Sequence, residues 1–198
     1  MRHQWYADHR DIVKWGALFQ LAALHDLGSI LQIAYLTADD PPPLIVSELG
    51  ESPVYSSVLR HFRDIHRITE LGRKGKPVVR VFDRPFAARM RNDYSRAAVE
   101  AVGTLAPRPA AVLLDPDTGM ADKPNSSKHV TGTEVAAIWS ALEPLDWLVL
   151  YQHASRESGW LESRRLSFSQ ALGLPSVITF QSPNGARDVA FYAACRKT

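Results

Sequence analysis

The chain has 198 residues, of which 45% are hydrophobic and 22% are charged, with 11 glycines and 13 prolines. This is the composition of a globular protein large enough for one α/β domain, and it excludes collagen-like, coiled-coil and disordered chains. We expect no membrane span, because no apolar run approaches ~20 residues, and no signal peptide, because the N-terminus is too polar. Cys195 is the single cysteine, which excludes a disulfide framework and a cysteine-built zinc site and favours a reducing, cytoplasmic location.

Positive charge is concentrated in one window of the sequence, from Arg60 to Arg96, although the formal net charge is only +2. The window holds eleven Lys and Arg residues against four Asp and Glu residues. Such a local excess attracts phosphate groups, and arginine is well suited to contact them. We therefore expect RNA or DNA to bind this window, with contacts from Arg60, Arg63 and Arg67. A solvated helix face is the structural alternative.

The predicted elements alternate between helices and strands along the chain. Apolar residues at three- and four-residue spacing predict the first helix, with Asp8 as its N-cap and Gly28 as its stop. Ser52 followed by a proline predicts the start of a second helix, and Thr131 with Glu134 forms a capping-box pattern before a later one. In chain order we predict helix 8–27, strand 29–36, helix 52–68, strand 78–82, helix 89–105, strand 110–114, helix 131–145, strand 147–151, helix 157–172 and strands 176–181 and 189–194.

Two of the predicted strands, 110–114 and 147–151, are short continuous apolar runs, which are typical of parallel strands buried on both faces. We therefore place them side by side at the centre of the sheet. Strands that alternate with helices predict a three-layer, Rossmann-like α/β fold with a mostly parallel sheet. The last two strands are joined through Asn184 and Gly185, a strong turn signal, and predict a C-terminal antiparallel hairpin. This ending is typical of the methyltransferase version of the fold, and we expect 1–198 to form one α/β domain.

Polar side chains follow the two central strands, at the sheet edge where open α/β folds bind their ligands. Asp115 and Asp117 follow the first strand, and Gln152, His153 and Arg156 follow the second. Carboxylates beside a histidine can hold a metal ion or accept the proton of an amine. We therefore expect the two aspartates and His153 to be catalytic, and Gln152 and Arg156 to contact the substrate. The alternative is that Asp115 caps the loop, that Asp117, Thr118 and Gly119 form a turn, and that His153 is a polar residue at a helix N-terminus.

Two further groups are candidates for binding. Lys128 and His129 stand just before a predicted helix N-terminus, where anions bind well, and we expect them to contact the substrate. Solvent exposure explains them equally well. His9, Asp11 and Lys14 stand at the start of the first helix. On the residues alone we interpret this second group as helix capping with one exposed ion pair between Asp11 and Lys14.

The pattern His-x-Asp-x-x-Lys, formed here by His9, Asp11 and Lys14 before an apolar helix, resembles the start of a bacterial ribosomal-RNA adenine-N6 methyltransferase family. That family carries an Asp-Pro-Pro-Tyr motif after a buried strand, where this chain has Asp115 and Pro116. The resemblance implies that His9, Asp11 and Lys14 lie near S-adenosylmethionine and that Asp115 lies near the target amine. This chain departs from the family in two places. It has no glycine after the first strand, and Asp-Pro-Asp-Thr replaces Asp-Pro-Pro-Tyr.

Three functions are compatible with these observations. The first is a methyltransferase-like enzyme that uses S-adenosylmethionine and acts on a nucleic acid or a nucleotide-containing substrate. The second is a nuclease or phosphoesterase in which Asp115, Asp117 and His153 hold Mg²⁺ or Mn²⁺. The third is a non-catalytic binding module on the same fold. The order of elements, the final hairpin, Asp115 and the basic window favour the first.

Overall fold

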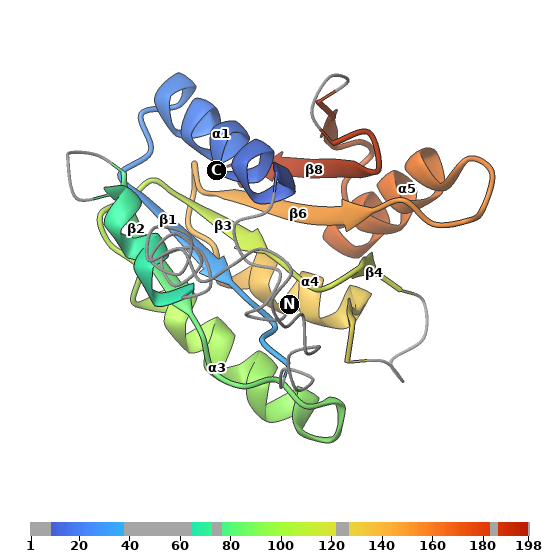
Figure 1. Cartoon of the computed structure of the whole chain (residues 1–198). Coiled ribbons are helices and arrows are strands. Elements are labelled where there is room, and N and C mark those ends of the chain that lie inside the picture. Colours follow the sequence, from blue (N-terminus) through green and yellow to red (C-terminus); the bar gives the residue numbers. More distant parts are fainter. Residues whose placement is uncertain (1–8, 38–64, 73–76, 122–126, 183–185, 198) are drawn as a thin grey trace, which may run out of the picture.

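The computed structural model describes residues 9–37, 65–72, 77–121, 127–182 and 186–197. The helices are α1 (His9–Leu24), η2 (Ile65–Gly72), η3 (Ala88–Met90), α3 (Arg91–Gly103), α4 (Gly132–Ala141) and α5 (Trp160–Leu172), of which η2 and η3 are 3₁₀ helices. The strands are β1 (Ser29–Ile33), β2 (Val78–Phe82), β3 (Ala110–Leu114), β4 (Gly119–Met120), β5 (His129–Val130), β6 (Trp147–His153), β7 (Ile178–Phe180) and β8 (Val189–Cys195). Figure 1 shows the main strands between α1 on one side and α3 and α4 on the other.

The main sheet has six strands in the order β2-β1-β3-β6-β8-β7. The first four strands are parallel, whereas β8 lies between β6 and β7 and is antiparallel to both. The predicted α/β fold with a mostly parallel sheet and an antiparallel C-terminal hairpin is therefore confirmed. The two short strands β4 and β5 pair with each other in a separate parallel sheet.

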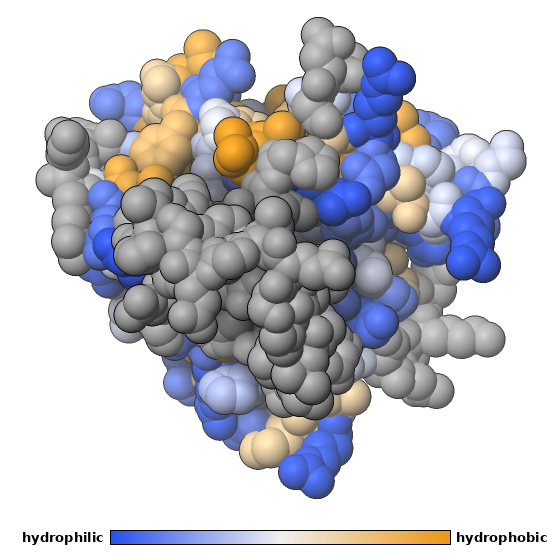
Figure 2. Space-filling view, viewed as in Figure 1, coloured by the Kyte–Doolittle hydropathy of each residue, from blue (hydrophilic) through white to orange (hydrophobic). Residues whose placement is uncertain are grey.

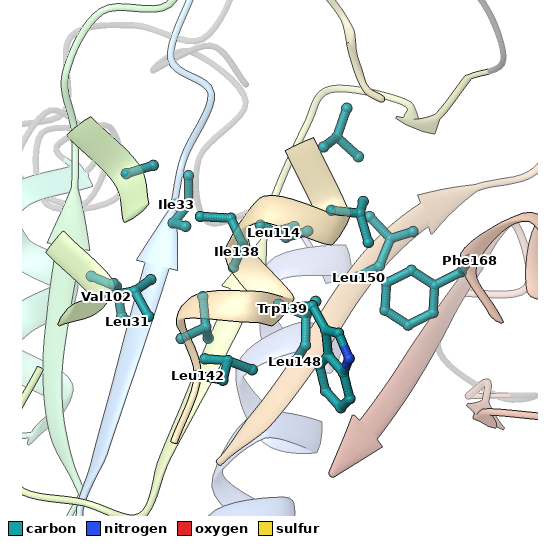
Figure 3. Close-up of a cluster of buried hydrophobic side chains, with 14 of the residues drawn as sticks. Leu31, Ile33, Val102, Leu114, Ile138, Trp139, Leu142, Leu148, Leu150 and Phe168 are labelled. Atoms are coloured by element: carbon teal, nitrogen blue, oxygen red, sulfur yellow. The ribbon is translucent and has the colours of Figure 1, made fainter. Parts of the chain in front are cut away.

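The two strands predicted to lie at the centre are neighbours, as expected. Val112 of β3 pairs with Leu148 of β6, and every residue of β3 is buried. Because alternate side chains of a strand point to opposite faces, these strands contribute to two cores. Val112 and Leu148 belong to a core with residues of α3, α4 and α5. Figure 3 shows Leu148 in this core, together with Ile138 of α4 and Phe168 of α5. Leu113 and Val149 pack with α1 and η2 on the other face. The sheet is covered on both faces, which confirms the three layers.

The start of the chain differs from the prediction in its helix end and in its buried face. The first helix ends at Leu24 rather than at Gly28, and Asp26 beyond it has a φ of 47°. Gly28 instead permits a close approach, because a Cβ there would lie 2.9 Å from the ring of Pro107. The apolar side chains of α1 are not all buried, since Ile12 is 70% exposed and Leu24 is 72% exposed. Figure 2 shows hydrophobic residues gathered over this helix.

Other element ends follow from the local backbone. The first strand ends at Ile33, because Tyr35 has a φ of 46° and cannot continue it. The capping box of Thr131 and Glu134 is confirmed, but the helix that it begins ends at Ala141 rather than at residue 145. The last predicted helix begins at residue 160 rather than 157, and the one predicted over 89–105 is split into η3 and α3.

Several predictions lie outside the described residues. They are the N-cap Asp8, most of the helix predicted over 52–68, and the turn at Asn184 and Gly185. The described end of that helix belongs to η2, which is a 3₁₀ helix rather than an α-helix. Within the residues that the structure describes, no helix combines the length and the apolar character that a bilayer span requires.

Candidate functional site

The candidate site lies where the order of strands reverses. In the main sheet, β2 follows β1 in the sequence and lies on one side of it, whereas β6 follows β3 and lies on the other side. Open α/β sheets bind ligands outside the carboxyl ends of the strands at such a switch point. Asp115 directly follows β3 at this point, and its backbone N–H donates to the carbonyl oxygen of Ile33 in β1 at 3.0 Å.

A cluster of four polar residues, Asp11, Lys14, Gln32 and Asp115, lies at the switch point. Lys14 of α1 and Asp115 are only 1% and 2% exposed, and Lys14 Nζ lies 2.8 Å from Asp115 Oδ2. Lys14 also forms an ion pair with Asp11, one turn earlier in the helix. Gln32 of β1 donates from Nε2 to the same oxygen of Asp115 at 2.5 Å. The ion pair between Asp11 and Lys14 exists as predicted from their spacing, but it is buried rather than exposed.

Electrostatics keep Lys14 charged in this buried position. Burial alone lowers the pKa of a lysine, but the carboxylates of Asp115 and Asp11 outweigh it, so the pKa of Lys14 rises well above its ordinary value of 10.5. Lys14 is therefore a permanent cation. It holds two carboxylates in place at the carboxyl edge of the sheet.

A cavity of about 460 Å³ opens beside this cluster. It is lined by Arg10, Asp11, Lys14, Asp115, Pro116, Asp117, Thr118, Tyr151, His153 and Ala154. The three residues that we expected to be catalytic, Asp115, Asp117 and His153, thus lie around one cavity, together with Asp11 and Lys14 from the start of the chain. Its volume falls within the roughly 300–1,000 Å³ of small-molecule sites.

His153 lies on the wall formed by β6. Its Nε2 hydrogen-bonds to the hydroxyl of Tyr151 at 3.1 Å. Burial and then the nearby charge of Arg10 lower the pKa of His153 from its ordinary 6.5. The ring is therefore mostly neutral at pH 7, and a neutral imidazole has one nitrogen that can accept a proton. Tyr151 also presents its ring to Lys14, whose Nζ lies 5.1 Å from the ring centroid.

Arg10 lines the same cavity and already forms an ion pair. Its guanidinium forms an ion pair with Asp188, with 2.7 Å between Nη2 and Oδ2. This contact ties the start of α1 to the turn that precedes β8. The hydrogen bond from Arg10 lowers the pKa of Asp188, so the pair is charged at neutral pH.

Gln152 was expected to contact the substrate, but its amide is used by the backbone. Its Nε2 donates to the carbonyl oxygens of Thr118 at 2.9 Å and His153 at 2.8 Å, and its Oε1 accepts from the N–H of Met120 at 2.8 Å. Gly119 between them has a φ of 105°, and a Cβ there would lie 2.2 Å from Gln152 Oε1. Gln152 therefore holds the segment that carries Asp117 and Thr118 over the cavity.

The other expected contact residues are not among the described residues that line the cavity. Lys128 and Arg156 are exposed. His129 is half-buried, and its Nδ1 hydrogen-bonds to the hydroxyl of Thr118, which does line the cavity. Burial lowers the pKa of His129, and neighbouring Arg164 lowers it further. The side chain of His9 lies outside the part of the chain that the structure describes.

Ion pairs with acidic residues neutralise part of the positive charge of the window from Arg60 to Arg96. Arg67 pairs with Glu70 at 3.4 Å, and Arg96 pairs with Asp93. Arg91 does not belong to the exposed part of the window, because it is buried and its Nη1 lies 2.5 Å from Oε2 of Glu134. Exposed bases without an ion pair among the described residues are Arg80, Arg84 and Arg89. Arg60, Arg63, Arg73, Lys74 and Lys76 lie outside the described residues.

Beside the candidate site, β1 and its end have two structural features that sequence reasoning missed. Tyr35 takes a left-handed conformation that favours glycine, at the place where glycine is absent from the sequence. Its backbone N–H donates to the hydroxyl of Tyr94 at 2.9 Å. Gln32 was missed too, although a glutamine inside the apolar run Ser29–Ile33 was the available signal.

Similarity to known proteins is found among solved structures. No protein-family model and no curated protein matches the sequence. Among solved structures, the chain is similar to the Burkholderia thailandensis 1,6-didemethyltoxoflavin-N1-methyltransferase, crystallised with 1,6-didemethyltoxoflavin and S-adenosylhomocysteine. The TM-score is 0.41 and the identity is 16%, over 98% of this chain and 84% of that one.

Proposed function

We propose that this chain is a methyltransferase-like enzyme that uses S-adenosylmethionine and methylates a nucleic acid or a nucleotide-containing substrate. The observation that carries the proposal is the buried ion pair between Lys14 and Asp115. The resemblance to a ribosomal-RNA adenine-N6 methyltransferase family implies that Lys14 lies near the cofactor and Asp115 near the target amine. Although 101 positions separate the two residues, they meet at 2.8 Å at the switch point of the sheet. This meeting supports a single shared site.

The charges around the cavity fit the methyl donor. S-adenosylmethionine carries a carboxylate, an ammonium group and a sulfonium centre, so its site needs charges of both signs. Arg10 and Lys14 supply cations, and Asp11, Asp115 and Asp117 supply anions, all within one cavity. These residues would hold the amino-acid and sulfonium end of the cofactor.

The end of β1 supports a rebuilt contact with the rest of the cofactor. Related folds use glycine after the first strand, because a backbone without Cβ can turn sharply and approach a ligand closely. Here Tyr35 makes the glycine-like turn with a φ of 46° and buries its ring in the core. The chain therefore makes the glycine-like turn after β1 without a glycine.

The residues of the site can orient an acceptor nitrogen and remove its proton. The cofactor, when bound, supplies an electrophilic methyl group. Asp115 is fixed by Lys14 and Gln32, so its carboxylate can accept a hydrogen bond from an amine and direct the nitrogen lone pair. Neutral His153, held by the hydroxyl of Tyr151, can take up the proton that the nitrogen loses.

The charge of Lys14 disfavours the metal-dependent alternative. A divalent cation held by Asp115 and Asp117 would lie close to an ammonium group that is itself buried, and like charges repel strongly where water is excluded. Within the described residues, no group of three or more His, Cys, Asp or Glu side chains is arranged to hold a metal ion. A Mg²⁺- or Mn²⁺-dependent phosphoesterase is thus an outcome that the experiment must test.

Calorimetric titration of the purified chain tests the proposal. We expect S-adenosylmethionine to bind, whereas Mg²⁺ and Mn²⁺ alone do not. We further expect Asp115→Asn to lower methyl transfer by ~10²-fold or more, because asparagine cannot supply the charge that orients the amine. Asp93→Asn, at an exposed carboxylate of α3, is the matched control. Binding of Mn²⁺ without S-adenosylmethionine would favour the phosphoesterase, and binding of neither would favour a non-catalytic module.

A further inference from the structure

The charges around the cavity do not balance. Among the described lining residues, Arg10 and Lys14 are cations and Asp11, Asp115 and Asp117 are anions. Arg10 is paired outside this set, with Asp188. Lys14 therefore remains as the cation that faces three carboxylates, and the described wall of the cavity carries an excess of negative charge.

Asp117 is the carboxylate that accounts for this excess. Asp115 and Asp11 both contact Lys14, whereas Asp117 makes no hydrogen bond or ion pair with any residue that the structure describes. It is half-buried and lies on the segment that Gln152 fixes to β6. Its charge is thus held at the cavity wall rather than on a loose loop.

The remaining titratable group on the wall does not restore the balance. His153 has a lowered pKa and is mostly neutral at pH 7. Tyr151 has its ring facing Lys14 and its hydroxyl bonded to His153. A negative charge that is partly withdrawn from water and lacks a protein partner is stabilised by a bound cation.

We infer that Asp117 selects a cationic centre in the ligand of this cavity, and so distinguishes the methyl donor from its neutral demethylated product. The inference rests on the proposed function, since it assigns the sulfonium of S-adenosylmethionine to Asp117. Transfer of the methyl group leaves a neutral thioether, S-adenosylhomocysteine. An anionic wall therefore holds the donor more tightly than the spent cofactor and favours release of the latter.

Binding of three ligands that share the same nucleoside and amino-acid parts tests the inference, without any measurement of methyl transfer. The ligands are S-adenosylmethionine with its sulfonium, S-adenosylhomocysteine with a neutral thioether, and sinefungin with an ammonium-bearing carbon in place of the sulfonium. We expect the wild type to bind S-adenosylmethionine and sinefungin about tenfold more tightly than the thioether. Equal affinity for S-adenosylmethionine and S-adenosylhomocysteine would overturn the inference, whatever the affinity for sinefungin.

Asp117→Asn removes the charge and keeps the shape of the side chain. We expect this variant to bind S-adenosylhomocysteine as the wild type does, but to lose most of the tenfold preference for the cations. Asp93→Asn is the control and should keep the preference, because Asp93 is exposed and pairs with Arg96. An unchanged preference in Asp117→Asn would overturn the inference and leave the proposed function standing.

Binding of small organic cations tests the cation site even if the proposed function is wrong. If the wild type binds none of the three nucleosides, the proposed function fails. Trimethylsulfonium and tetramethylammonium are then compared with neutral tert-butanol by NMR of the His153 ring. Shifts caused by the two cations and absent in Asp117→Asn would support a cation site, whereas equal effects of all three probes, or none, would overturn it.

Discussion

The backbone N–H of Tyr35 donates a hydrogen bond to the hydroxyl of Tyr94, with 2.9 Å between nitrogen and oxygen. Tyr35 holds a φ of 46°, which costs a non-glycine residue roughly 1–2 kcal/mol. Its ring packs against Phe86 and Tyr94, with centroids 5.1 Å away in both pairs. These contacts offset a strained turn at the carboxyl end of β1, next to the candidate site.

We predict that Tyr35→Gly is more stable than Tyr35→Ala by roughly 1 kcal/mol, because both variants lose the ring but only glycine adopts a positive φ without strain. Urea denaturation of the two variants measures the difference. Leu31→Gly and Leu31→Ala, in the regular part of β1, form the control pair and should rank in the opposite order. A Tyr35→Ala variant as stable as Tyr35→Gly would show that the turn is not strained.

The fold was predictable because burial leaves a strong pattern in the sequence. Continuous apolar runs identify β3 and β6, and the capping box of Thr131 and Glu134 identifies the start of α4. Asp115 was predictable because it follows a central strand. The partners of Asp115 were harder to predict, since contacts across 83 and 101 positions depend on how the elements pack.

The role of Gln152 shows a second limit of sequence reasoning. A polar residue at the end of a central strand can face either the cavity or a neighbouring loop, and its position in the sequence is the same in both cases. The deciding feature is the close approach of Gly119, which places backbone donors and acceptors of residues 118 and 120 around the Gln152 amide.

Gly119→Ala is predicted to be strongly destabilising. An alanine Cβ would lie 2.2 Å from Gln152 Oε1, and the φ of 105° is unfavourable for any residue with a Cβ. Gly159→Ala is the matched control, because Gly159 also has a positive φ, 75°, but open space around it. We expect a loss of roughly 1–2 kcal/mol for the control and a clearly larger loss for Gly119→Ala, measured by thermal and urea unfolding. Equal losses would mean that Gln152 moves aside freely.

Stability should fall as the pH drops from 7.5 to 5.5. Burial lowers the pKa of His153 and of His129 in the folded chain, so below the unfolded value of about 6.5 the unfolded chain binds more protons than the native one. The lost stability is recovered as the pH rises above that value. Urea unfolding at three pH values measures the slope. His153→Gln should show a smaller loss over this interval, and parallel curves for variant and wild type would contradict the assignment.

Binding of RNA or DNA through the window from Arg60 to Arg96 predicts a steep dependence on salt. Each phosphate contact that is lost should reduce the slope of log affinity against log salt by roughly 0.7–0.9. We expect the triple variant Arg60→Ala, Arg63→Ala and Arg67→Ala to have a smaller slope than the wild type. Fluorescence anisotropy with a labelled oligonucleotide measures both. No binding by the wild type at low salt would remove the nucleic-acid partner.

Lys14→Met is predicted to destabilise the chain by about 3–5 kcal/mol, because it leaves the carboxylates of Asp115 and Asp11 without their buried cation. Adding Asp115→Asn to this variant removes one of the two carboxylate charges that have lost their cation. We therefore expect the double variant to be more stable than Lys14→Met alone, although it carries one more substitution. Urea unfolding of the wild type, both single variants and the double variant gives the coupling energy.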